Sequence, residues 1–211
     1  MKQIKQSRRE INKNKVIQCA LKSFVNNGIE NSKVSDIAKE AGVTERSAFR
    51  YFNSKADLVL ETALLFYRYV IKHIEEDYNK NVNKDATGLE KIRFVIKEYM
   101  SLYFSSPNEI IFVNEAEVYL NRCGYTSLIN NKPPSKYEDE IGPLATAIKE
   151  GIKDGSVRND DDIPSLYYNT YDSVLGLMEK MIIDSKKDIK YDERKRLDIF
   201  CEILVNSYAK Q

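Results

Sequence analysis

The chain of 211 residues carries 33 basic and 32 acidic side chains, and 42% of its residues are hydrophobic. This composition is typical of a soluble globular protein that can build one large or two modest domains. No apolar run reaches the roughly 20 residues of a membrane span, and no apolar stretch of the signal-peptide kind follows the basic N-terminus. We therefore expect a cytoplasmic protein with no membrane partner.

The charge is distributed unevenly along the chain. Residues 1–60 contain 12 Lys or Arg and 6 Asp or Glu, a balance of +6, whereas the remainder has a balance of −5. A basic first part and an acidic second part suggest two regions with different partners, the first facing an anion. An excess of solvated lysines in a loose tail would give the same balance, so the charge alone does not establish an anionic partner for residues 1–60.

The cysteines and the single histidine limit the available chemistry. Cys19, Cys123 and Cys201 lie far apart with no metal-ligand spacing, and His73 is the only histidine, which excludes a Cys/His zinc site. Cys19 and Cys201 fall on apolar helical faces, where a free cysteine acts as a small hydrophobic residue. No Gly-rich phosphate loop and no Ser/His/Asp arrangement is present. We expect no enzyme, no metal and no cofactor.

Almost every long segment shows the 3.6-residue hydrophobic period of a helix, and none shows the sustained alternation of a strand. Gly is a common helix stop, and Ser and Thr are common N-terminal caps. The first helix is expected to end at Gly28, and the second to span about 33–41 after a Ser32 cap. The third is expected to span about 45–52 after a Thr44 cap, and the fourth to run from Ser54 to about Tyr78.

Five more helices follow the polar stretch 79–88. The fifth carries an apolar stripe from Ile92 to Tyr103, the sixth begins at Pro107, and residues 122–137 are expected to form the one long loop. The seventh ends at Gly155, the eighth opens after three aspartates at 160–162, and the ninth carries a stripe from Leu197 to Tyr208. The pattern predicts an all-α protein of about nine helices.

Residues 34–52 show the pattern of a helix-turn-helix motif. Two short helices meet at 41–43, where Gly42 relieves a tight turn and Val43 fills the corner. The second helix of such a motif enters the major groove of DNA, and its outward side chains reach the base edges. Arg46 and Arg50 are four residues apart and share one face, and arginine suits bidentate contact with guanine.

Residues 9–60 resemble the DNA-binding domain of the TetR/AcrR family of bacterial repressors. The order and spacing of many residues carry the resemblance: Val16-Ile17, Ala20-Leu21, Phe24, Gly28, Ile37-Ala38, Ala41-Gly42-Val43, Tyr51-Phe52, Ser54-Lys55 and Leu58. The family implies a three-helix DNA-binding domain at 1–55 and a larger helical domain for ligand binding and dimerisation at 56–211. Beyond residue 60 the match is architectural, with a turn at 150–155 that is typical of the family.

The resemblance also assigns residues to the DNA. Ser32, Tyr51 and Lys55 would hold backbone phosphates. Six others would face the groove or its rim: Lys33, Thr44, Glu45, Arg46, Ser47 and Arg50. The chain departs from the family at Phe49, where a tyrosine hydroxyl usually touches phosphate, and at Arg46, where the family often has a small residue. Because of these departures, an operator sequence cannot be transferred from a relative.

For the second region, the family implies a ligand pocket enclosed by the fifth to eighth helices, and a dimer made by the eighth and ninth. The candidate ligand-binding residues are Tyr99, Tyr103, Phe112, Glu115, Tyr119, Tyr167 and Tyr171. Ordinary core packing explains an inward aromatic equally well, and a surface role explains Glu115. The predicted function is that of a repressor whose homodimer binds a palindromic operator in double-stranded DNA and is released by a small-molecule effector. The alternatives are a monomer, and a DNA-binding activator or architectural protein without a small-molecule ligand.

Overall fold

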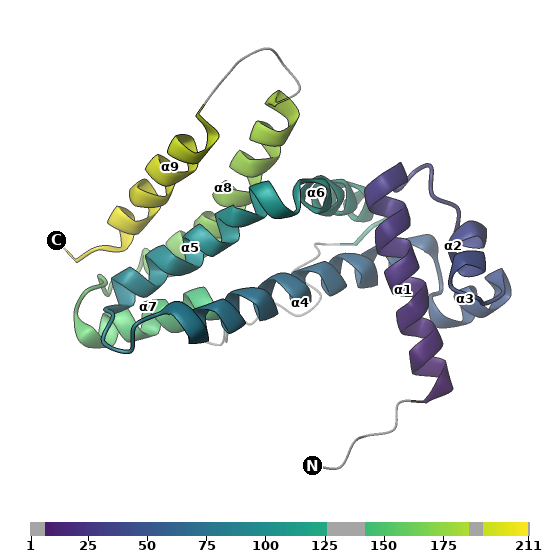
Figure 1. Ribbon diagram of the computed structural model, residues 1–211, viewed down its shortest axis with the longest axis horizontal. Helices are drawn as coiled ribbons and strands as arrows, with labels where there is room; N and C mark the ends of the chain where they lie inside the picture. The colour runs from purple at the N-terminus through teal and green to yellow at the C-terminus, as the bar shows by residue number, and fades with distance from the viewer. Residues whose placement is uncertain (1–6, 126–141, 186–191, 211) are drawn as a thin grey trace. The chain divides into compact units, whose positions relative to one another are not determined.

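The computed structural model describes residues 7–125, 142–185 and 192–210 (Figure 1). These ranges contain α-helices and one isolated bridge, between Val157 and Ala209, but no β-strand, so the all-α prediction is confirmed. The helices are α1 (Arg8–Asn27), α2 (Val34–Glu40), α3 (Glu45–Tyr51), α4 (Lys55–Asn81), α5 (Gly88–Ser105), α6 (Pro107–Arg122), α7 (Pro143–Asp154), α8 (Ile163–Asp184) and α9 (Glu193–Tyr208). None of them is long and apolar enough to cross a membrane.

The described chain divides into two compact units. Unit 1 comprises residues up to 68 together with 111–125, and unit 2 comprises 69–110, 142–185 and 192–210. Helices α4 and α6 therefore each contribute residues to both units. This grouping follows contacts and not function, so the functional boundary expected between residues 55 and 56 stays a prediction.

Unit 1 is built on α1, whose ends are set by local hydrogen bonds. The Glu10 amide donates to the Ser7 hydroxyl (3.2 Å) and the Ser7 amide donates to the Glu10 carboxylate (3.0 Å), which is a capping box. Gly28 ends the helix at φ 77°, a conformation that favours glycine, as the sequence predicts. On the buried face of α1, the Phe24 ring stacks on Phe112 of α6 with centroids 5.8 Å apart.

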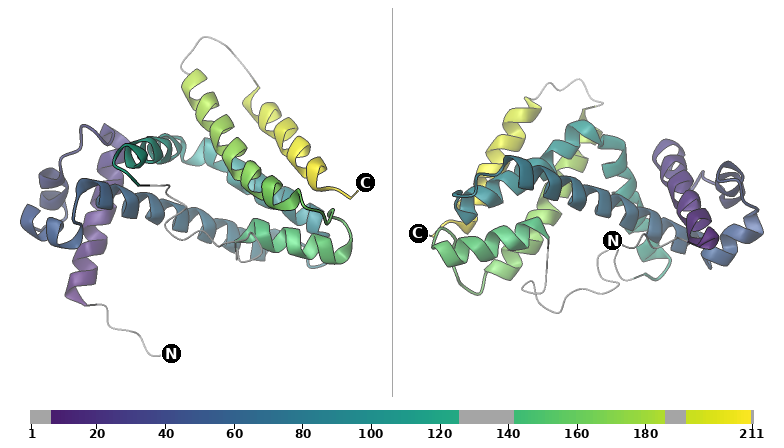
Figure 2. Two further views of the ribbon diagram at one scale, coloured as in Figure 1. Left: turned by 180° about the vertical axis from the view of Figure 1, so that it is seen from behind. Right: turned by 60° about the horizontal axis from the view of Figure 1, so that its bottom comes forward.

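Unit 2 is organised around α5, which contacts α7, α8 and α9. Its inward face is mostly apolar, with Ile92, Val95 and Ile96 no more than 2% exposed, and it also carries the hydroxyl-bearing Tyr99 and Tyr103. Helices α8 and α9 lie side by side and antiparallel (Figure 2). A hydrogen bond of 2.8 Å between the hydroxyls of Thr170 and Tyr208 joins them, and both side chains are buried.

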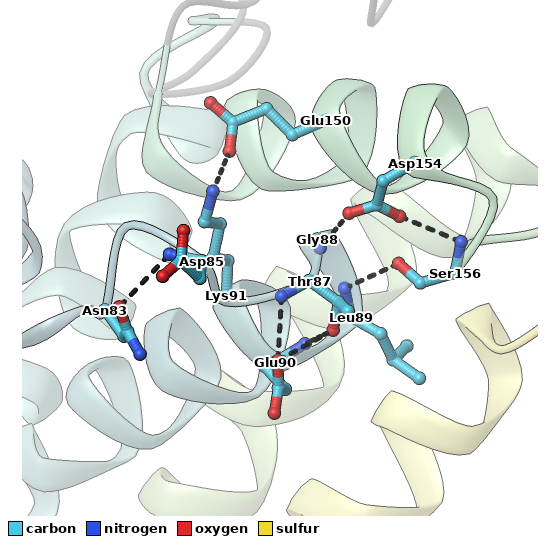
Figure 3. Close-up of polar contacts among 10 residues, drawn as sticks. All are labelled: Asn83, Asp85, Thr87, Gly88, Leu89, Glu90, Lys91, Glu150, Asp154 and Ser156. Atoms are coloured by element: carbon cyan, nitrogen blue, oxygen red, sulfur yellow. Dashed lines mark hydrogen bonds and ion pairs between the residues drawn. The ribbon is translucent and has the colours of Figure 1, made fainter.

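A polar cluster fastens the start of α5 to the end of α7 (Figure 3). The Asp154 carboxylate accepts hydrogen bonds from the amides of Gly88 (2.7 Å) and Ser156 (2.9 Å), and the Ser156 hydroxyl accepts one from Leu89 (3.1 Å). Two amides at the N-terminus of α5 that lack partners within the helix are thereby satisfied. The Lys91 ammonium, 2.7 Å from the Glu150 carboxylate, adds a second link between the helices. This cluster explains the turn at 150–155 that the sequence marks.

Three sequence-based expectations about helix limits need comment. Ser32 does not cap α2, because Lys33 occupies the cap position and no side chain bonds there. Asp162 precedes α8 without capping it, and its carboxylate binds Arg158 (2.8 Å) instead. The loop expected at 122–137 falls mostly outside the described residues, which stop at Tyr125 in this part of the chain.

Candidate nucleic-acid interface

The helix-turn-helix expected at 34–52 is formed by α2, a turn at 41–44, and α3. Gly42 has φ 71° in the turn, and the Val43 amide donates to the Ala38 carbonyl (2.9 Å), which closes the corner. Ala38 and Ala48, both fully buried, occupy the inner faces of α2 and α3. Each of these helices has only seven residues and is too short to be stable alone, so packing on α1 must hold both in place.

Thr44 starts α3. Its hydroxyl oxygen accepts a hydrogen bond from the Ser47 amide (3.2 Å), as the sequence predicts, and the hydroxyl also donates to the Ser47 hydroxyl (3.0 Å). A cap of this kind stabilises a helix by about 1 kcal/mol. Glu45 follows in the first turn, where its negative charge faces the positive end of the helix dipole. The first turn of α3 is therefore stabilised by interactions within the chain.

The outward face of α3 carries two arginines. Arg46 and Arg50 are both exposed and lie one turn apart, and no ion pair holds either of them among the residues that the structure describes. Phe49 lies between them in sequence with 43% of its surface exposed, the only large hydrophobic side chain of α3 that is exposed to this degree. A short helix with two unpaired guanidinium groups and an accessible aromatic ring suits insertion into a major groove.

A second group of predicted residues lies around the base of α3. Lys55 as a residue is half-buried, and its ammonium donates a long, exposed hydrogen bond to the Glu30 carbonyl (3.4 Å). Tyr51 is also half-buried, with its ring edge-on to Phe52 at 6.4 Å, and Lys33 is exposed at the start of α2. Lys55 opens α4, a helix of 27 residues whose N-terminal amides and dipole favour a phosphate.

Ser32 does not suit the phosphate role that the family resemblance assigns to it. Its side chain is 3% exposed, and its hydroxyl donates to the carbonyls of Gly28 (2.8 Å) and Ser23 (3.1 Å) and accepts from the Ser23 hydroxyl (2.9 Å). These bonds tie the loop after α1 back to that helix. In this conformation the Ser32 hydroxyl is directed into unit 1, so it positions the loop and does not face a ligand.

Two basic residues of the N-terminal region are neutralised within unit 1. The Lys13 ammonium lies 2.8 Å from the Glu61 carboxylate and over the Phe52 ring, and Lys22 lies 2.9 Å from Glu40. The Lys22–Glu40 pair is already counted in the +6 balance of residues 1–60, whereas the Lys13–Glu61 pair offsets one further positive charge. Arg46 and Arg50 of α3 are among the cations of the described part of unit 1 that no ion pair holds.

Sequence reasoning missed one residue near the start of α4. The Tyr125 hydroxyl hydrogen-bonds to the Asp57 carboxylate in the first turn of this helix. That bond raises the pKa of Tyr125 above its ordinary value. No local signal could reveal the pair, because 68 residues separate its members. The contact places a tyrosine beside the helix turn that also carries Lys55.

Four of the seven predicted ligand-binding residues lie in unit 2. Tyr171 has its ring edge-on to both Tyr99 (centroids 5.3 Å apart) and Tyr167 (5.4 Å). Tyr103 is buried with its hydroxyl hydrogen-bonded to Glu193, and burial, followed by that bond, raises its pKa to about 12. The structure thus brings three of the tyrosines into one cluster and gives Tyr103 a partner at the start of α9.

The other three predicted ligand-binding residues lie in unit 1. Phe112 is 1% exposed and stacks on Phe24, as a core residue does. Glu115 is exposed near Gly28, and Tyr119 is half-buried beside Cys123, where burial is the main cause of its raised pKa. The seven residues therefore divide between the two units, and their shared role as a ligand site stays a prediction.

Comparison with known proteins gives three kinds of match. Residues 16–62 match the model of bacterial regulatory proteins of the tetR family. The fatty acid metabolism regulator protein of Bacillus subtilis is 27% identical over 148 residues, which cover 70% of this chain and 72% of that protein. The transcriptional repressor KstR2 of Mycolicibacterium smegmatis is 24% identical over 157 residues, which cover 74% of this chain and 72% of that one.

The fold is also shared with solved structures. The regulator FadR from B. subtilis, solved in complex with stearoyl-CoA, superposes with a TM-score of 0.65 at 23% identity and covers 91% of this chain and 97% of its own. KstR2 of Mycobacterium tuberculosis gives a TM-score of 0.54 at 18% identity, over 99% of this chain and 98% of its own. These relatives are named as regulators.

Proposed function

Because the chain belongs to the TetR family of bacterial regulatory proteins and is a DNA-binding transcriptional regulator, we propose that it is a repressor released by a small molecule. The observation that supports this most directly is the α3 surface, where Arg46 and Arg50 are exposed and unpaired on a capped, tightly packed helix. The role of the protein is regulatory and not catalytic, and the protein acts in the cytoplasm on double-stranded DNA.

Within the interface, we divide the residues by task. The side chains of α3 read base edges: Thr44, Glu45, Arg46, Ser47 and Arg50. Lys33, Tyr51 and Lys55 hold backbone phosphates around the base of α3 and the start of α4. Phosphate contacts position a protein on DNA, whereas base contacts specify the sequence. Ser32 is left out of the phosphate set because its hydroxyl bonds within unit 1.

Two substitutions test this division. Lys55→Ala should weaken binding to all sequences alike and lower the salt dependence of affinity, because it removes one phosphate contact. Arg46→Ala should change preference at one or two base pairs, by about 1–3 kcal/mol at each. Lys153→Ala, which removes an exposed cation of α7, is the matched control and should leave binding unchanged.

The measurement is a gel-shift titration on the DNA flanking the chain's own gene, with single base-pair variants and at several salt concentrations. Equal losses on every sequence for Lys55→Ala and Arg46→Ala would contradict the division of tasks. Salt-sensitive binding without sequence preference would favour the alternative, an architectural DNA-binding protein.

The acting form is a homodimer joined through α8 and α9. These helices leave large apolar side chains exposed in the single chain: Tyr168, Ile183, Ile199 and Ile203, the last at 58%. Ile199 and Ile203 are four residues apart on one face of α9. A dimer would bury this surface and would present two copies of α3 to the half-sites of a palindrome, about 34 Å or a multiple apart.

Sedimentation equilibrium tests the dimer. Ile203→Glu should shift the chain toward monomer, because a carboxylate would then be buried at the interface without a partner. Ile71→Glu places the same charge at an exposed position of α4 (44%) and should leave the dimer intact. A chain that is monomeric at micromolar concentration before any substitution would refute the dimer.

The effector site is proposed around the unit 2 tyrosines Tyr99, Tyr167 and Tyr171, whose ring cluster offers apolar surface with hydroxyls at its edge. Phe112, Glu115 and Tyr119 remain candidates with less support, because the structure gives each a role or neighbour within unit 1. The B. subtilis relatives, one named for fatty acid metabolism and one solved with stearoyl-CoA, make a long-chain acyl-CoA the first effector to test.

Helix α4 carries the signal, since residues 55–68 belong to unit 1 and 69–81 to unit 2 of one continuous helix. An effector that favours one position of α4 displaces the two copies of α3 from their half-sites. The effector can do so only if it binds the DNA-bound and the released positions of α4 with different affinities. The free energy that couples effector binding to operator binding is typically about 1–3 kcal/mol.

Anisotropy of labelled operator, titrated with stearoyl-CoA and with coenzyme A as the control, tests the release. A fall in operator affinity of roughly 5- to 150-fold is expected with the acylated compound alone. Unchanged affinity at saturating stearoyl-CoA would refute acyl-CoA as the effector.

A further inference from the structure

Helices α4 and α5 bring the only histidine of the chain next to two carboxylates within unit 2. His73 Nε2 lies 3.4 Å from Asp77 Oδ2, one turn further along α4. Glu98 of α5 completes the group, and one ligand atom from each of the three residues lies within 4.8 Å of the other two. The His73 side chain is 57% exposed and that of Asp77 is 24% exposed, so an ion can enter from solvent.

The distances suit a metal ion. Zinc binds imidazole nitrogen and carboxylate oxygen at about 2.0–2.2 Å, so two ligand atoms at a tetrahedral angle are about 3.4 Å apart. The pair His73 and Asp77 already has this separation. Glu98 must move its carboxylate by at most about 1.4 Å to match, which rotation about its three side-chain torsions can supply. Two ligands spaced i and i+4 on one helix face recur in zinc sites.

The packing of the two helices sets this register. The Tyr78 ring lies edge-on to Phe94 with centroids 6.0 Å apart, and Tyr78 follows Asp77 while Phe94 lies one turn before Glu98. Ile74, between His73 and Asp77 in sequence, is 4% exposed and anchors the inner face of this stretch of α4. The Tyr78–Phe94 contact therefore joins the same stretches of α4 and α5 that carry the three ligands.

We infer that His73, Asp77 and Glu98 form a binding site for a divalent transition metal, with zinc as the expected ion and water completing its coordination. An imidazole with two carboxylates suits zinc better than magnesium or calcium, which favour all-oxygen sites. The sequence excludes a zinc site of cysteine and histidine, but this site uses one histidine and carboxylates from two helices. It shares no residue with the sets proposed to bind DNA and effector, although Glu98 directly precedes Tyr99 on α5, and its test does not depend on the proposed function.

The test is calorimetric titration of the untagged, full-length chain with zinc chloride. His73→Ala and Glu98→Gln should each weaken zinc binding at least about tenfold, since removing even an outer-shell partner costs about 10- to 100-fold. Lys80→Ala should strengthen it, because the Lys80 ammonium lies 3.8 Å from Asp77 and competes with the ion. Glu76→Gln, on the same helix, and Cys123→Ser, which removes an exposed thiol, are controls that should not change it.

A second measurement uses the uniqueness of the imidazole. Because His73 is the only histidine, one set of imidazole NMR resonances reports on the site, and one equivalent of zinc should shift it. Exchange broadening or shift of these resonances with zinc, and not with magnesium, supports the site. Resonances that do not move, or zinc binding that survives both His73→Ala and Glu98→Gln in variants with a native circular dichroism spectrum, would overturn it.

Discussion

Replacement of Gly151 by alanine should destabilise unit 2, because α5 and α7 approach each other there without room for a side chain. A Cβ on Gly151 would lie 2.3 Å from a methyl carbon of Val157 and 3.2 Å from the Cα of Gly88. Val157 is 2% exposed, and the Gly88 amide is held by the Asp154 carboxylate, so neither neighbour can move freely. Overpacking of this kind costs about 1–3 kcal/mol, and the better helix propensity of alanine offsets up to about 1 kcal/mol of it.

Because the 2.3 Å approach to Val157 is far inside van der Waals contact, we take the upper end of the overpacking cost. The expected net loss in the free energy of unfolding is then about 2 kcal/mol, which lowers Tm by roughly 4–8 °C in a chain of this size. Gly88→Ala should cost more, since its Cβ would lie 2.1 Å from main-chain atoms of Gly151. Gly176→Ala in α8 is the control, because its Cβ would meet nothing within 4 Å of the single chain. Urea unfolding followed by circular dichroism measures all three variants. A Gly151→Ala protein as stable as the wild type would refute the reasoning.

Three further predictions concern the interface and the acidic groups. Thr44→Ala should lower the free energy of unfolding by about 1 kcal/mol in urea titrations and weaken operator binding, whereas Thr44→Ser should preserve both, because serine keeps the capping oxygen. Phe49→Tyr should tighten binding to all DNA sequences in gel shifts by adding a phosphate donor to an exposed ring; tightening confined to one sequence would contradict this. Hydrogen bonds from Ser156, and then from Gly88, hold the pKa of Asp154 below its ordinary value of 3.8. The stability that they supply is complete above that value and is lost as the pH falls through the lower, folded-state pKa, so Asp154→Asn should flatten the acid limb of a urea-midpoint profile.

The helix-turn-helix could be predicted from the sequence because its signals are local. Gly28 ends α1 with a positive φ, and the Thr44 hydroxyl accepts from an amide three residues later. Such interactions join positions no more than about four residues apart, so residue order alone reveals them. The exposure of Arg46 and Arg50 follows from the same local helix, whose buried residue, Ala48, lies between them.

The candidate effector site could be predicted only in part. The 3.6-residue period shows that Tyr99 and Phe112 face inward, but it does not show what they face. Phe112 stacks on Phe24, 88 residues earlier in the chain, and both lie in unit 1. Tyr99 contacts Tyr171, and both lie in unit 2. Periodicity identifies a buried face and carries no information about the partner across it.

The sequence by itself therefore determined the helices, the Thr44 cap and the arginines that α3 presents, because each of these depends on neighbours along the chain, whereas the Ser32 cap that it suggested is not formed. The tertiary structure alone decided that the Ser32 hydroxyl bonds to Ser23 of α1, that Tyr125 meets Asp57, and that Glu98 lies beside His73. These contacts join residues on different helices or loops. Their geometry is set by how buried faces pack together, and no spacing in the sequence records it.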